Sequence, residues 1–226
     1  MKKKSSLFFI ISGALFLLFA LFTPIVALVD KSVVTYTADI QAEVGLSGIN
    51  QAVFKVLGGS SFWYDFTELL GMIALGLAAA FALLGLYQLT TRRHLSFVDY
   101  PILLLGALYA LVIFFYFLFE VLIINYRPIL MDGVLEASYP SSHSMLALCV
   151  FMSAPLASHH LIESRALRIT VAALSAFLAV FTAIGRLLSG AHWFTDILGS
   201  LLLSAALVSL YTAALLFFKN KINREF

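Results

Sequence analysis

Apolar residues occur along the chain in long runs that are separated by shorter polar segments. A helix needs about 20 mostly apolar residues to cross a bilayer. Windows of this kind lie at Leu7–Val29, Phe66–Leu89, Tyr100–Ile124, Ser144–Leu161, Ile169–Leu188 and Phe194–Phe218. The pattern therefore predicts an all-α fold, a bundle of six transmembrane helices.

The first window follows Lys2, Lys3 and Lys4 and could be read as a signal peptide. Its apolar stretch is longer than the core of a typical signal peptide, and no clear small-x-small cleavage site ends it. We therefore expect an uncleaved membrane anchor. The longest polar connection follows at about residues 30–65, where Gly58-Gly59-Ser60-Ser61 predicts a turn.

The distribution of basic residues predicts the orientation of the bundle. Six spans place both ends of the chain on one side of the membrane. That side then holds ten of the fourteen basic residues, namely Lys2, Lys3, Lys4, Arg92, Arg93, Arg165, Arg168, Lys219, Lys221 and Arg224. The other side keeps Lys31, Lys55, Arg127 and Arg186. Because basic residues favour the cytoplasmic side, the pattern predicts that both termini lie inside, N-in and C-in.

The composition agrees with an integral membrane protein. The 226 residues are 62% hydrophobic and only 12% charged, whereas soluble domains are nearer half apolar. The single cysteine, Cys149, excludes an intramolecular disulfide. The net charge of +2 gives no indication of a nucleic-acid partner. Length and composition predict one membrane domain over residues 1–226, with a core at about 66–218 and an outer loop at 30–65.

Polar side chains from separate segments are predicted to meet at the outer face. They are Arg127 and Pro128 after the third span, Ser141, Ser142 and His143 at the start of the fourth, Arg186 at the end of the fifth, and His192 and Asp196 around the start of the sixth. Each has an ordinary explanation alone, such as a helix cap for the serines or an interfacial anchor for Arg127. Ionisable residues are costly at such depths, so their convergence on one face indicates a functional site.

These residue types suit a phosphate group. The free N–H groups at a helix N-terminus, here at Ser141 and Ser142, attract anions. Arg127 and Arg186 have guanidinium groups that match phosphate oxygens. One ring nitrogen of His192 can attack phosphorus, as in other covalent mechanisms.

The remaining site residues complete this chemistry. Asp196 can hold the other ring N–H of His192 and thereby fix the tautomer. His143 can protonate the leaving oxygen. Since the arginines and the helix end already supply positive charge, we expect neither a metal nor another cofactor.

Three segments, in this order, carry a family resemblance: "NYRP" at Asn125–Pro128, "YPSSH" at Tyr139–His143, and "GRLLSGAHWFTD" at Gly185–Asp196. The set resembles the motifs of the type 2 phosphatidic acid phosphatase (PAP2) superfamily of membrane lipid phosphatases. The resemblance covers about residues 66–218. It implies catalysis through a phosphohistidine on His192, with Asp196 as its partner and His143 as general acid.

Three positions depart from the family pattern. Ser142 stands where glycine is commonest, and Gly185 stands where serine usually precedes the arginine, which removes one side-chain phosphate donor. Glu120 stands seven residues before Arg127, where the family usually has lysine. Its carboxylate could oppose phosphate binding, point away, or brace Arg127 or another cation in an ion pair. We favour the brace and keep Glu120 in the expected substrate-binding set.

The resemblance implies a lipid phosphatase that acts at the outer leaflet of a bacterial cytoplasmic membrane. The implied substrate is a phosphate or diphosphate ester of a membrane-embedded alcohol. Undecaprenyl diphosphate leads, and phosphatidylglycerophosphate and phosphatidic acid follow. The alternative is a non-catalytic lipid-phosphate binding or transport protein on the same fold. His143, His192 and Asp196 argue against it, because binding alone requires no nucleophile, orienting group and acid together.

Overall fold

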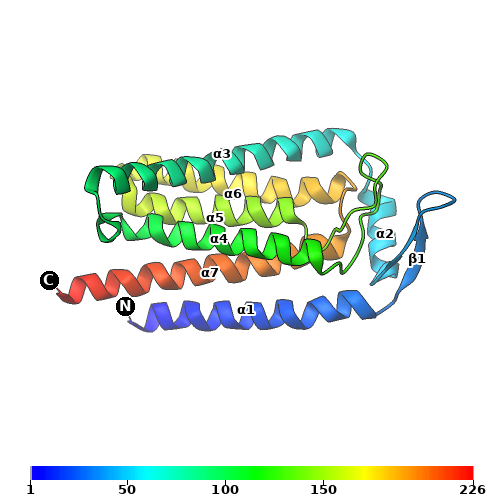
Figure 1. Cartoon of the computed structure of the whole chain (residues 1–226), viewed down its shortest axis with the longest axis horizontal. Helices are drawn as coiled ribbons and strands as arrows, with labels where there is room; N and C mark the ends of the chain where they lie inside the picture. Colours follow the sequence, from blue (N-terminus) through cyan, green and yellow to red (C-terminus); the bar gives the residue numbers. More distant parts are fainter. Residues whose placement is uncertain (1, 226) are drawn as a thin grey trace.

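The computed structural model describes residues 2–225, with side chains from 3 to 222. Met1 and Phe226, the ends of the expected domain, lie outside the described residues, as do the side chains of Lys2 and Arg224. The elements, shown in Figure 1, are α1 Lys2–Leu28, β1 Ser32–Thr35, β2 Gln41–Val44, α2 Ser47–Leu57, α3 Ser61–Arg92, the 3-10 helix η1 Leu95–Phe97, α4 Tyr100–Val121, α5 Ser142–Leu161, α6 Arg165–Leu188 and α7 Phe194–Glu225.

The predicted membrane helices are confirmed. Within the described residues, α1, α3, α4, α5, α6 and α7 are each long and apolar enough to cross a bilayer. Each covers one of the six predicted windows. Most begin earlier or end later than predicted, because the helices continue into polar residues beyond the apolar run, whereas α4 ends at Val121, before the predicted Ile124. The side chain of Ser164, for example, accepts a hydrogen bond from the N–H of Leu167 at 3.4 Å and so begins α6 before its apolar residues.

The central helix of the bundle is α5. It contacts α3, α4, α6 and α7 and is the most buried of the spans. It also has the lowest mean hydropathy of the six, 1.3, because a helix shielded from lipid needs no apolar outer face. Met145, Cys149 and Phe151 of α5 are fully or almost fully buried. His143, in its first turn, is therefore attached to the most firmly packed helix of the fold.

The segment between α1 and α3 (the α1–α3 segment, residues 29–60) is more ordered than the sequence suggested. Strand β1 pairs antiparallel with β2, so that Ser32 lies opposite Val44. Helix α2 follows and lies across the end of the bundle (Figure 1). The predicted turn is present, with Gly58 ending α2 and Gly59 at a positive φ of 104°. Both ends of the chain lie at the opposite end of the bundle (Figure 1).

Candidate active site

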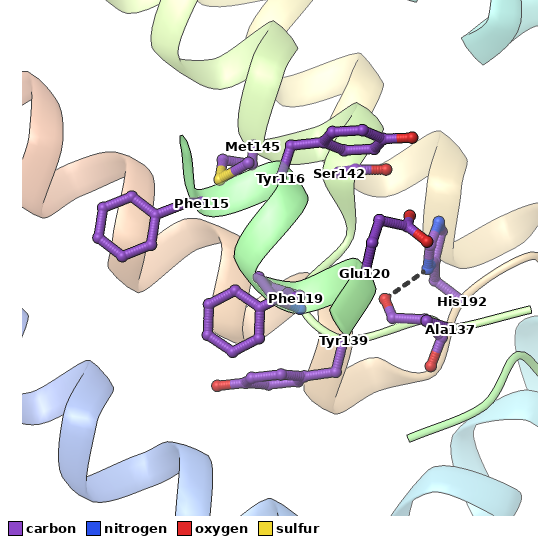
Figure 2. A pocket seen from close by; sticks show the side chains of 11 residues that line it. Phe115, Tyr116, Phe119, Glu120, Ala137, Tyr139, Ser142, Met145 and His192 are labelled. Carbon is purple, nitrogen blue, oxygen red and sulfur yellow. Dashed lines mark hydrogen bonds between the residues drawn. The ribbon is translucent and has the colours of Figure 1, made fainter. Parts of the chain in front are cut away.

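The predicted site residues gather at the end of the bundle that α2 covers. They come from the α4–α5 loop (residues 122–141), the first turn of α5, the last turn of α6, the α6–α7 loop and the first turn of α7. A polar cavity of about 500 Å³ opens here, lined by Arg127, Ser142, His143 and the carboxylates of Glu120 and Glu136. His192 lines a smaller adjoining cavity with Glu120 and Ser142 (Figure 2).

The ring of His192 is held in one orientation and is 2% exposed. Its Nδ1 lies 3.1 Å from the backbone oxygen of Ser138 (dashed in Figure 2), and its Nε2 lies 3.4 Å from Nη1 of Arg127. Since a carbonyl only accepts and a guanidinium only donates, we assign the proton to Nδ1 and the free lone pair to Nε2. Nε2 thus carries the lone pair of the ring, and it faces an arginine.

Burial holds the pKa of His192 well below its ordinary value, and the positive charges of Arg127 and Arg186 lower it further. The imidazole is therefore neutral at neutral pH. A neutral ring keeps the lone pair that an attack on phosphorus requires.

Asp196 is close to His192 but does not hold its ring N–H by a hydrogen bond. Its Oδ2 lies 3.6 Å from Nδ1, beyond hydrogen-bonding distance. The same oxygen accepts the N–H of Trp193 at 2.8 Å, which ties the α6–α7 loop to the first turn of α7. The direct partner of the ring is the carbonyl of Ser138, and the fully buried side chain of Asp196 lies behind it. A backbone acceptor of this kind leaves no signal in a sequence.

Arg127 is placed by the return of its own loop. Its N–H donates to the backbone oxygen of Glu136 at 3.0 Å, and its Nε lies 3.1 Å from the Glu136 carboxylate. Its backbone oxygen accepts a hydrogen bond of 2.7 Å from the hydroxyl of Tyr36 in the α1–α3 segment. Pro128 is buried beside it. These contacts leave the end of the guanidinium directed at His192.

The α1–α3 segment also supports the start of α7. The buried side chain of Asn50 in α2 accepts the N–H of Thr195 at 3.1 Å and donates to the Thr195 hydroxyl at 3.0 Å. It also donates to the backbone oxygen of Gly45 at 3.0 Å. Asn50 thus satisfies a free N–H of the α7 N-terminus from a distant element. The sequence did not reveal this role.

Arg186 is fully buried against α3, a contact that we did not predict. Its Nη2 lies 2.9 Å from Oε1 of Glu68, and its Nη1 donates to the hydroxyl of Thr67 at 3.3 Å. Its guanidinium also lies over the ring of Tyr64, 5.5 Å from the centroid. Glu68 was detectable in principle, since it is the one charged residue in the window Phe66–Leu89.

The two serines of the fourth-span motif have different surroundings. Ser141 is fully buried, and its hydroxyl accepts the N–H of Ser144 at 3.3 Å and contacts the Ser144 hydroxyl at 3.0 Å. It is therefore the N-cap of α5. Ser142 lines the polar cavity instead. His143 also lines it, and its Nε2 lies 3.3 Å from Oε1 of Glu68.

Glu120 does not form the ion pair that we favoured from the sequence. It is exposed near the end of α4 and lines the polar cavity. In the part of the chain that the structure describes, the acidic partner of Arg127 is Glu136, and no cation pairs with Glu120. The physical reason is the path of the α4–α5 loop. A backbone hydrogen bond in this loop places Arg127 opposite Glu136, so the carboxylate of Glu136 lies beside Nε of Arg127.

An apolar groove of about 350 Å³ runs from the site between α3, α4 and α5. Its walls are mostly hydrocarbon, including Met72, Leu75 and Ile113. Glu68 and His143 line the groove as well, and His143 also lines the polar cavity. At the site the polar cavity thus meets the apolar groove, which runs along the helices.

Comparison with known proteins gives one family and one fold. The model of the PAP2 superfamily matches residues 4–220. No curated protein matches the chain. A similar fold occurs in the crystal structure of a transmembrane PAP2-type phosphatidylglycerolphosphate phosphatase from Bacillus subtilis, with a TM-score of 0.61 and 19% sequence identity. The match covers 93% of this chain and 96% of that one.

Proposed function

The chain belongs to the PAP2 superfamily, and from this premise we propose that it is a membrane lipid phosphatase that works through a phosphohistidine on His192. The observation that carries the proposal is the free Nε2 of a buried, neutral His192 that faces Arg127 beside a polar cavity. A protein that only bound lipid phosphate would not need an uncharged imidazole in this position.

In the first step the substrate phosphate occupies the polar cavity. Nε2 of His192 attacks phosphorus, and the bond between phosphorus and the lipid oxygen breaks. The electron pair of that bond stays on the lipid oxygen, which takes a proton from His143. Arg127 and Arg186 stabilise the negative charge on the phosphate oxygens as the transition state forms.

In the second step water hydrolyses the phosphohistidine. The water oxygen bonds to phosphorus, the bond to Nε2 breaks, and His143 takes a proton from the water. During the covalent stage the ring of His192 is cationic. The carbonyl of Ser138 and the buried carboxylate of Asp196 stabilise that cation from the Nδ1 side.

The apolar groove supports a lipid substrate, because its hydrocarbon walls meet the polar cavity at His143. The tail would lie along α3, α4 and α5 while the phosphate enters the cavity. The bias of basic residues supports an N-in, C-in bundle in a bacterial cytoplasmic membrane, with the site at the outer leaflet. Undecaprenyl diphosphate, phosphatidylglycerophosphate and phosphatidic acid are the substrates to test.

The test is phosphate release by the purified protein in detergent from each of these three lipids. Wild type is expected to release phosphate from at least one of them, and His192→Ala to release none. His159→Asn, an exposed histidine at the other end of α5, is the control and should match wild type. A folded wild-type protein that binds these lipids and releases no phosphate would favour the non-catalytic alternative.

A further inference from the structure

One carboxylate oxygen of Glu68 lies close to two basic side chains from two other helices. Oε1 lies 2.9 Å from Nη2 of Arg186 in α6 and 3.3 Å from Nε2 of His143 in α5. These two groups are the ones that the proposed mechanism directs at the phosphate and at the leaving oxygen. A carboxylate oxygen with a guanidinium and an imidazole as partners has the surroundings of a bound phosphate oxygen.

Arg186 needs an anion here. Its side chain has no exposed area, and an unpaired charge is costly when it is removed from water. The guanidinium is also held by the hydroxyl of Thr67 and the ring of Tyr64. In the absence of substrate, Glu68 is the anion that neutralises it.

Glu68 is the partner that can move. Its side chain is 36% exposed, and it lines the apolar groove with His143. A lipid that enters along the groove therefore brings its phosphate to His143, where the groove meets the polar cavity and where the Glu68 carboxylate lies beside the same ring. The phosphate and the carboxylate carry the same charge and compete for the same two donors, so both cannot occupy this position.

We propose that Glu68 is a resident counter-ion that keeps Arg186 and His143 in place in the empty site and is exchanged for the substrate phosphate. On binding, a phosphate oxygen takes the donors of Arg186 and His143, and the carboxylate moves away from both. Glu68 is a positioning residue in this scheme. The inference rests on the proposed function, because it takes the phosphate as the displacing anion.

Exchange and simple bracing predict different results. If Glu68 only braces the helices, its loss lowers stability and leaves the affinity for phosphate unchanged or weaker. If Glu68 is exchanged, its loss also lowers the stability of the empty protein, but phosphate then binds without a competitor. Glu68→Gln should therefore lower the melting temperature of the empty protein and raise its affinity for phosphate.

The experiment is thermal unfolding in detergent with increasing sodium phosphate, at an ionic strength held constant with sodium chloride. A ligand that binds the folded state raises the melting temperature in proportion to its affinity. Glu68→Gln is expected to show an apparent Kd for phosphate lower by on the order of fivefold than wild type, equivalent to about 1 kcal/mol. Asp65→Asn removes the same charge from an exposed position three residues earlier in α3 and should match wild type.

An equal or weaker affinity in Glu68→Gln, or no effect of phosphate on either protein, overturns the exchange. If Glu68→Gln is not recovered folded, Glu68→Asp keeps the charge but shortens the reach, and it should also bind phosphate more tightly than wild type. An unchanged Kd in that variant overturns the exchange equally. The measurement needs no turnover, so it is independent of the lipid assay, whose failure would count against the proposed function alone.

Discussion

Replacing Gly185 by serine tests the packing that holds Arg186. A Cβ atom at this position would lie 2.5 Å from Cγ2 of Thr67 and 2.9 Å from Cε3 of Trp63, both in α3. Real Cβ atoms essentially never approach other heavy atoms this closely, so these two side chains or the helices that carry them have to shift. Overpacking of this kind costs about 1–3 kcal/mol. A protein of this size loses roughly 2–4 °C of melting temperature per kcal/mol.

The same shift should impair the site, because Arg186 is the next residue and its donors are aimed at Glu68 and Thr67. We expect Gly185→Ser to lower both the melting temperature and kcat/KM, although related proteins usually have serine there. The added hydroxyl could bind phosphate only if the helices kept their present spacing.

Thr67→Ser provides the compensating change. It removes the Cγ2 atom of the closest clash and keeps the hydroxyl that accepts from Arg186. The double variant should recover part of the loss, with Trp63 responsible for the remainder. Gly76→Ser in α3 is the matched control, since no atom lies within 4 Å of its Cβ position. A Gly185→Ser protein as stable as wild type and more active would refute this reasoning.

Three further predictions address the charge, the support and the protonation of the site. Glu120→Lys should lower KM by on the order of fivefold, because it replaces an unpaired anion in the polar cavity with a cation. An unchanged or higher KM in steady-state kinetics would show that Glu120 does not face the substrate. Asn50→Ala leaves the buried N–H of Thr195 without a partner, so it should lower the free energy of unfolding by about 1–3 kcal/mol. The variant should show a lower melting temperature together with a lower kcat. Unaltered stability would contradict the capping role. Because the pKa of His192 is depressed, the ring should be protonated, and kcat/KM should fall, only well below its ordinary pKa of 6.5. An acid limb at pH 6.5 or above, with chemistry rate-limiting, would contradict the neutral state assigned to the ring.

The sequence predicted the membrane helices well because lipid imposes a strong rule on them. A span must be apolar over its whole length, so the windows are visible without any knowledge of neighbours. The hairpin and α2 were missed for the opposite reason. They are short, and their stability comes from contacts with distant residues, such as that between Asn50 and Thr195, rather than from a local pattern.

The candidate site was predictable where its side chains lie near helix ends in recognisable spacing. His143, Arg186 and His192 are of this kind. Contacts between side chains of different helices were not predictable, because they depend on how each helix is rotated and placed. Glu68 faces Arg186 only because α3 packs on α6. From the sequence we favoured Glu120 as the partner of Arg127. Only the return of the loop shows that Glu136 takes that place.

The central claim is that phosphate passes through a covalent bond to His192. It is tested most directly by incubating the purified protein with a lipid substrate carrying radioactive phosphate, quenching within the turnover time, and examining the protein for label. A phosphohistidine is expected in wild type, labile in acid and stable in alkali, and absent from His192→Ala. Phosphate release without protein label, or label that persists in His192→Ala, would contradict the account.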